Sequence, residues 1–189
     1  MNLLIALALL TALITISPQA MRQQAAPSRN LMAELAEKGL PIQGATSLER
    51  CYLDGNALGH VFEGELKERG PQSTSVDLKG LHHQPALPPD GPFLWQYANE
   101  RRLLHGVIAV TPHTSPIYKT MFDGSVDQRN ILSILASALK NIVREIQQPS
   151  ENNPSVILEG ISHTGISITT IIDLQTRRVK TFYPTASQP

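Results

Sequence analysis

Apolar residues in the middle of the chain recur at the spacing of an α-helix. From residue 131 to residue 146 they return every three or four positions, which places them on one helical face. Ser125 or Asp127 can cap the start of this helix, and the helix is expected to end before Pro149. A shorter helix is predicted over Leu31–Lys38, where helix-forming residues are followed by Gly39.

The C-terminal part has the pattern of strands. Runs rich in β-branched residues span 156–159, 166–173 and 179–183, with short polar connections that predict an antiparallel meander. Residues 103–110 are also predicted to form a strand, and the two prolines within 111–122 indicate a loop. We therefore predict an α+β fold, with N-terminal helices followed by a mainly antiparallel sheet.

The most apolar segment lies at the N-terminus. Residues 3–16 carry no charge, and the first basic residue is Arg22. A run this short does not reach the roughly 20 residues of a membrane helix but fits the apolar region of a signal peptide. We expect export to the periplasm or out of the cell, with no stable membrane association after signal removal. The alternative is an uncleaved N-terminal anchor.

The predicted organisation has three parts. Residues 1–21 form the signal peptide or anchor, 22–57 a linker and helical lead-in, and 58–189 a single folded domain. Sixteen basic residues balance sixteen acidic ones, so the chain lacks the overall positive charge typical of nucleic-acid-binding proteins. Its one cysteine, Cys51, cannot form an internal disulfide, and we expect it to be partly buried and inert.

The six histidines are the main candidates for chemistry. We predict that His105 is structural within its strand and that His163 is a solvated residue beside a turn glycine. The remaining four lie in predicted loops, where catalytic groups concentrate: His60, His82, His83 and His113.

An ordered set of motifs surrounds these histidines. The sequence GHVFEGE begins at Gly59, GLHH begins at Gly80, Lys119 precedes the long helix, and TFYP begins at Thr181. Between about Leu58 and Pro184, this set resembles the EndoU endoribonucleases. The similarity is to bacterial EndoU toxin domains in particular, and also to the catalytic domain of the coronavirus uridylate-specific endoribonuclease.

The resemblance implies an EndoU/RNase A-like catalytic core in which His60 and His82 are the catalytic histidines. Lys119 matches the catalytic lysine but is displaced by several residues from its usual place. Either Lys119 reaches into the site, or His113 or an arginine supplies the positive charge. The implied substrate-binding residues come from the last strand and from neighbours of the catalytic groups: Thr181, Tyr183, His83 and Thr120.

In that family the ribose 2′-OH attacks the adjacent phosphorus, which leaves a 2′,3′-cyclic phosphate and a 5′-OH. Two histidines suit the two proton transfers because the ordinary histidine pKa is about 6.5, and which is base and which is acid stays open. A lysine ammonium stabilises the charge that develops on the phosphate. The resemblance implies cleavage of single-stranded RNA 3′ of uridine, without a metal or other cofactor and without action on DNA. A cognate immunity protein is an expected partner, as for toxin-type relatives.

Two other hypotheses compete with the nuclease. His60, His82 and His83 would form a metal site, although no typical metal-ligand spacing accompanies them. Alternatively, the chain is an exported, non-catalytic RNA- or protein-binding domain with an EndoU-like shell, which the neutral net charge favours.

Overall fold

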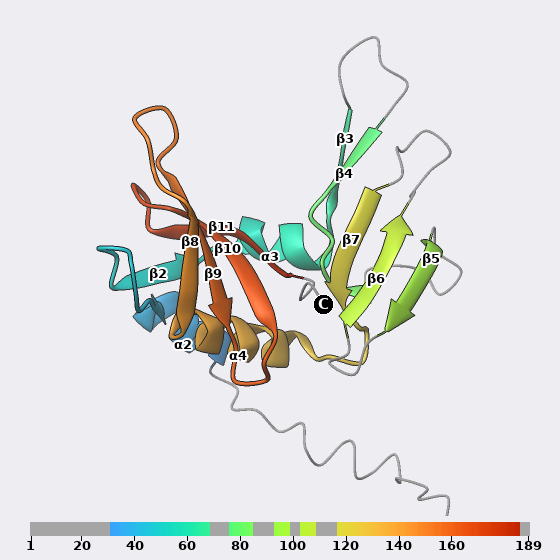
Figure 1. Ribbon diagram of the computed structural model, residues 1–189, viewed down its shortest axis with the longest axis horizontal. Coiled ribbons are helices and arrows are strands. Elements are labelled where there is room, and N and C mark those ends of the chain that lie inside the picture. The colour runs from blue at the N-terminus through green and yellow to red at the C-terminus, as the bar shows by residue number, and fades with distance from the viewer. Residues whose placement is uncertain (1–30, 69–75, 85–92, 99–102, 109–116, 186–189) are drawn as a thin grey trace, which may run out of the picture. The chain divides into compact units, whose positions relative to one another are not determined.

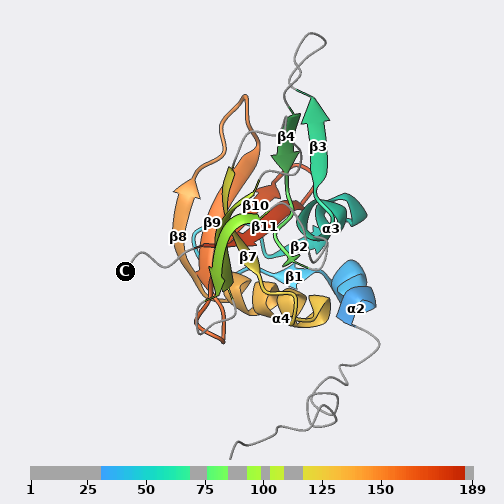
Figure 2. The same ribbon diagram turned by 90° about the vertical axis from the view of Figure 1, so that its right-hand side faces the viewer.

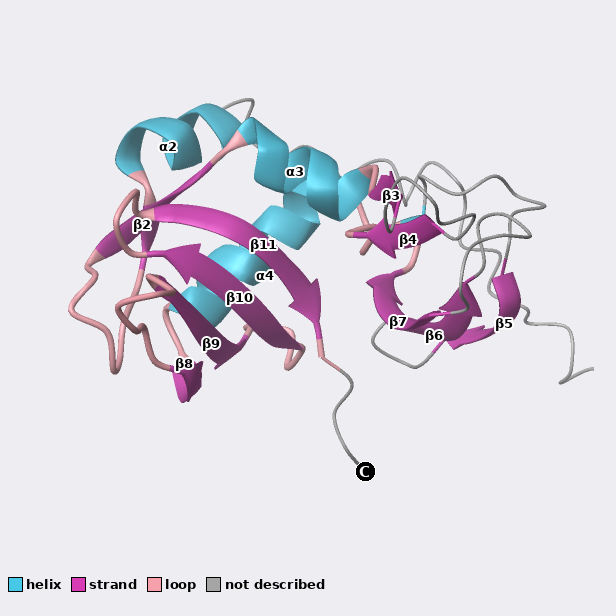
Figure 3. Cartoon of the chain, turned by 90° about the horizontal axis from the view of Figure 1, so that it is seen from above, coloured by secondary structure: helices cyan, strands magenta, loops and turns pink. Residues whose placement is uncertain are grey.

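A computed structural model describes residues 31–68, 76–84, 93–98, 103–108 and 117–185. This part of the chain has a mixed α+β fold in which strands predominate (Figure 3). The predicted signal peptide or anchor and His113 lie outside the described residues. None of the helices within the described ranges is both long and apolar enough to cross a membrane.

The largest sheet has the strand order β1-β2-β11-β10-β9-β8 (Figure 1). The predicted meander is confirmed, because β9, β10 and β11 pair antiparallel in succession. β2 joins the other edge of β11 in parallel, through Tyr52 and Leu53. The strands of this sheet are β1 Leu40–Pro41, β2 Arg50–Leu53, β8 Ile142–Gln147, β9 Ser155–Ile161, β10 Ser167–Asp173 and β11 Arg178–Pro184.

A second sheet contains β5 (Phe93–Ala98), β6 (Leu103–Ile108) and β7 (Ile117–Phe122) in antiparallel order. The strand predicted to begin at Leu103 is therefore confirmed as β6. The predicted loop over 111–122 is wrong in its second half, because β7 pairs with β6 along its whole length. β3 (Glu65–Glu68) and β4 (Val76–Lys79) lie side by side as an antiparallel pair (Figure 2).

Three helices belong to the described part: α2 (Leu31–Lys38), α3 (Gly55–Phe62) and α4 (Gln128–Leu139). α2 has the predicted bounds, and Gly39 follows it with φ 71°. α4 is capped by the Asp127 carboxylate, which accepts a hydrogen bond from the Arg129 N–H at 3.1 Å. The apolar side chains of α4 that the periodicity places on one face are buried: Ile131, Leu132, Ile134, Leu135, Ala138 and Leu139.

α4 ends at Leu139, and the expectation that it continues toward Pro149 is wrong. Ile142–Gln147 forms β8 and pairs with β9, which leaves Val143 and Ile146 exposed. The three- and four-residue spacing continues past residue 139, but pairing with β9 prevails over this local pattern. The bond from the Ile161 N–H to the Asn141 carbonyl, at 3.0 Å, fixes the turn between α4 and β8.

The α+β class holds, but the predicted order of N-terminal helices followed by a sheet is not supported. Strands β1 to β7 all precede α4 in the chain. β1 and β2, from the range expected to be a linker and helical lead-in, instead form one edge of the largest sheet. The reason is tertiary, since β2 is held there by β11, which lies far along the sequence.

Gly160 on β9 allows the sheet to approach the end of α4 closely. A Cβ atom at this position would lie 2.1 Å from the Ala138 carbonyl oxygen. We expect Gly160→Ala to lower the free energy of unfolding by about 1–3 kcal/mol, because backbone must move to relieve the clash. Gly55→Ala is the control, since a Cβ there meets nothing within 4 Å. Urea unfolding measures both, and equal midpoints for the two variants would contradict the prediction.

Candidate active site

The segment Gly80–His83 is held between α3 and β7 by three backbone hydrogen bonds. The N–H groups of Leu81 and His82 donate to the carbonyls of His60 (2.8 Å) and Val61 (2.7 Å). The carbonyls of a helix's last turn have no partner within the helix, so this segment satisfies them. The Phe122 N–H in turn donates to the His82 carbonyl at 2.9 Å. His60 is therefore a helix residue of α3, and not the loop residue that the sequence predicted.

Two consecutive residues ahead of His82 adopt the left-handed backbone conformation. Gly80 has φ 66° and Leu81 has φ 59°, which is uncommon for a side chain of this size. The Leu81 side chain is buried with Leu78 and Met121, and this packing holds the conformation. A Cβ atom at Gly80 would lie 1.8 Å from the His60 carbonyl oxygen. The backbone of Gly80 thus approaches the His60 carbonyl closely. This approach brings the two histidine-bearing segments together and leaves no room for a larger residue at position 80.

We expect Gly80→Ala to destabilise the protein by about 2–4 kcal/mol, because it combines a strained φ with a backbone clash. Gly59→Ala is the matched control beside His60, since its Cβ would meet only a Glu63 carboxylate oxygen at 3.8 Å. Thermal or urea unfolding of both variants is the measurement. A Gly80→Ala variant as stable as Gly59→Ala would show that the two segments can separate without cost.

The rings of His60 and His82 lie close together, with centroids 6.3 Å apart and planes inclined by 50°. Tyr183 on β11 stacks on His82, at 5.1 Å between centroids and 28° between planes. His82 Nδ1 is buried and has no hydrogen-bond partner in the described part of the chain. Residues from α3, the Gly80–His83 segment and β11 thus converge.

Lys119 lies beside these rings on β7, and not in a loop. Its ammonium donates a hydrogen bond to the Gly80 carbonyl. Burial, and then the positive charge of Lys79, lower the pKa of Lys119 to about 8. Lys119 is therefore mostly charged at neutral pH but loses its proton under mildly alkaline conditions.

The same lysine acts on both histidines. Burial, then the charge of Lys119, then His60 lower the pKa of His82 to about 3. Burial and Lys119 also lower the pKa of His60, while the carboxylate of Glu65 opposes this effect. Both rings are accordingly neutral near pH 7, and a bound anion would raise both pKa values.

A cleft of about 310 Å³ opens beside His82. It is lined by one cationic side chain and no acidic one, and its lining residues are His82, Ile117, Tyr118, Lys119, Thr120, Tyr183, Pro184 and Thr185. The sequence predicted four of them: His82, Lys119, Thr120 and Tyr183. Ile117, Tyr118, Pro184 and Thr185 were missed, although each lies within two residues of a predicted one.

Two of the predicted substrate-binding residues do not line this cleft. His83 is buried, its Nε2 lies 2.8 Å from the Val126 carbonyl oxygen, and its ring meets Phe62 edge-on. The His83 side chain therefore packs inside the protein and does not face the cleft. Thr181 lies two residues before Tyr183 on β11, and its hydroxyl is buried with no hydrogen-bond partner among the described residues.

The residues that the sequence placed outside the site, His105, His163 and Cys51, do not line the cleft. His105 is buried in β6, where its Nδ1 lies 3.3 Å from the Thr120 hydroxyl. His163 is exposed and contacts the Ser137 hydroxyl at 2.8 Å. Cys51 is fully buried, and burial raises the pKa of its thiol to about 12.

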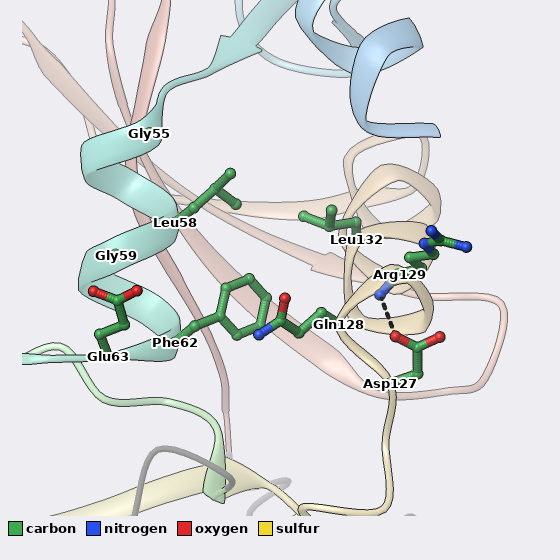
Figure 4. Close-up of a pocket in the computed structure, with 9 residues that line it drawn as sticks. All are labelled: Gly55, Leu58, Gly59, Phe62, Glu63, Asp127, Gln128, Arg129 and Leu132. Atoms are coloured by element: carbon green, nitrogen blue, oxygen red, sulfur yellow. Dashed lines mark hydrogen bonds between the residues drawn. The ribbon is translucent and has the colours of Figure 1, made fainter. Parts of the chain in front are cut away.

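A second hollow, of about 400 Å³, lies between α3 and the start of α4. Leu58 and Phe62 turn toward Gln128 and Leu132 across it (Figure 4). None of the residues predicted to carry chemistry lines this space. Within the described ranges, no group of three His, Cys, Asp or Glu side chains is arranged to hold a metal ion.

Comparisons of this chain with models of protein families, with curated proteins and with solved structures give no match. The EndoU resemblance accordingly depends on the motifs and stays a prediction.

Proposed function

We propose that this protein is a metal-independent endoribonuclease with an EndoU/RNase A-like catalytic core. The observation that carries the proposal is the convergence of His60, His82 and Lys119 from three separate elements. His82 and Lys119 line the cleft, and the His60 ring, which does not line it, lies against His82. Its substrate is single-stranded RNA, cut 3′ of uridine to leave a 2′,3′-cyclic phosphate and a 5′-OH. The positively charged, carboxylate-free lining of the cleft supports binding of a polyanion despite the zero net charge of the chain.

The separation of the two rings suits in-line displacement. One histidine removes the proton of the 2′-OH as that oxygen bonds to phosphorus, and the other protonates the departing 5′ oxygen. A phosphate to one side of the line that joins the two ring centroids, which are 6.3 Å apart, can accept hydrogen bonds of about 2.7–3.0 Å from both rings. The bound phosphodiester raises the pKa of both rings, which allows one of them to carry a proton near neutral pH.

Lys119 supplies positive charge to the non-bridging oxygens of the phosphate, where negative charge grows in the transition state. Its bond to the Gly80 carbonyl fixes the ammonium relative to the segment that carries His82. Tyr183 covers one face of His82 and holds the orientation of that ring. The same proposal includes that the protein is exported, that it acts as a toxin and that a cognate immunity protein binds it.

Incubation of the full chain with a uridine-containing RNA oligonucleotide in excess EDTA tests the proposal. We expect cleavage products that end in a 2′,3′-cyclic phosphate, which mass spectrometry distinguishes from a linear phosphate by the mass of one water. The same sequence with a 2′-deoxyuridine at the cleavage position must stay intact, because it lacks the nucleophile. Intact RNA across pH 5–8 would overturn the catalytic proposal in favour of a non-catalytic, exported binding domain.

A further inference from the structure

The stacking of Tyr183 on His82 changes what Tyr183 can do for a substrate. A planar ring has two faces, and His82 occupies one of them at 5.1 Å. Tyr183 can therefore offer at most its other face to a substrate. A second unstacked base of a single-stranded substrate needs another aromatic surface, because proteins hold such bases mainly by stacking.

Tyr118 is the other tyrosine that lines the cleft in the described part of the chain. It is 56% exposed, the most exposed of the large apolar side chains in that part. It directly precedes Lys119 on β7, and neighbouring side chains on a strand point to opposite faces. Tyr118 and Lys119 nevertheless both line the cleft, and Tyr118 is the more exposed of the two.

We infer that Tyr118 is the stacking platform for the base of the nucleotide next to the one held at Tyr183. The substrate class is then RNA with at least two consecutive unpaired bases around the scissile phosphate. Paired RNA is excluded, because its bases are stacked on one another and cannot reach a tyrosine face. This inference rests on the proposed function in one respect, namely that RNA occupies the cleft.

Binding of a five-nucleotide RNA with one central uridine tests the inference separately from cleavage. A 2′-fluoro group on the uridine removes the nucleophile, and fluorescence anisotropy at fixed salt reports the dissociation constant. We expect Tyr118→Ala to weaken binding by about 5- to 100-fold, the usual range for a lost base-stacking contact. Tyr118→Phe keeps the ring and should bind within about two-fold of wild type.

An abasic residue beside the uridine identifies which contact is lost. It should weaken wild-type binding by a factor similar to that of Tyr118→Ala and add little in the Tyr118→Ala protein. Ile146→Ala is the control. Ile146 is 47% exposed on β8, and two strands, β9 and β10, separate β8 from β11, which carries Tyr183. It should bind as wild type does.

Three outcomes overturn the inference: unchanged binding by Tyr118→Ala, an abasic penalty equal in both proteins, or no binding of the oligonucleotide by wild type. The proposed function is judged on an all-ribose version of the same oligonucleotide. Binding that depends on Tyr118 without cleavage would refute the nuclease but keep the platform. Cleavage by a Tyr118→Ala protein that binds as wild type does would refute the platform alone.

Discussion

Replacing His82 with alanine is expected to slow RNA cleavage by about 10²–10⁴-fold, and replacing His60 is expected to do the same. Each substitution removes one of the two groups proposed to transfer protons to or from the reacting oxygens. The measurement is the single-turnover rate on a uridine-containing oligonucleotide at saturating protein, so that weakened binding does not enter. The double variant should be little slower than the slower single variant if the histidines act in one concerted step.

His163→Ala is the control for these two variants, because His163 is exposed and does not line the cleft. It should cleave at the wild-type rate. Loss of the His82 ring removes its stacking on Tyr183 but none of the three backbone hydrogen bonds that hold the segment. Circular dichroism should therefore show a folded protein. A folded His82→Ala protein that cleaves within three-fold of the wild-type rate would refute the proposed role of His82 in proton transfer.

A substrate with sulfur in place of the 5′ bridging oxygen tells the base from the acid. A thiolate leaves without prior protonation, so the histidine that acts as acid becomes dispensable. The variant that lacks the acid should regain most of its activity on this substrate, and the variant that lacks the base should not. Rescue of both variants, or of neither, would contradict a division of the two roles between His60 and His82.

The fold could be predicted from sequence where local pattern and tertiary contacts agree. The run 131–139 buries its apolar face, and the meander β9-β10-β11 has short connections, so both were predictable. Residues 142–147 keep the helical spacing but pair with β9, and residues 117–122 follow two prolines but pair with β6. The secondary structure of these two segments is set by the strand with which each pairs, and a single sequence does not show which strand that is.

The candidate site divides in the same way. The motifs made His60, His82, Lys119 and Tyr183 candidates, because residue type and order along the chain are visible in a sequence. They could not show that adjacent histidines separate, with His82 at the cleft and His83 against Phe62 and Val126. Nor could they show the left-handed backbone of Gly80 and Leu81, which precede the pair. Tyr118 was missed because an exposed tyrosine has no sequence signal of its own.

Replacing Lys119 with methionine is expected to lower the cleavage rate by about 10²–10³-fold, because the variant lacks the ammonium that stabilises the transition state. The pH profile adds a second expectation. Since the pKa of Lys119 is about 8, wild-type activity should fall as the pH rises through that value and the charge is lost. Lys119→Arg stays charged up to about pH 12, so this alkaline fall should disappear even if the rate is lower.

The histidine pKa values provide a readout that does not depend on cleavage. Lys119 lowers the pKa of both His60 and His82, so removing its charge must raise both. NMR titration of the imidazole resonances should show this upward shift in Lys119→Met but not in Lys119→Arg.

Lys79→Met is a control with a smaller expected effect. Lys79 also lowers the pKa of His60 and of Lys119, but it contributes less than burial does. It should raise the pKa of Lys119 and move the alkaline fall in activity to higher pH. A wild-type profile that stays flat from pH 7 to 9.5, together with unchanged histidine titrations in Lys119→Met, would separate Lys119 from the chemistry of the site.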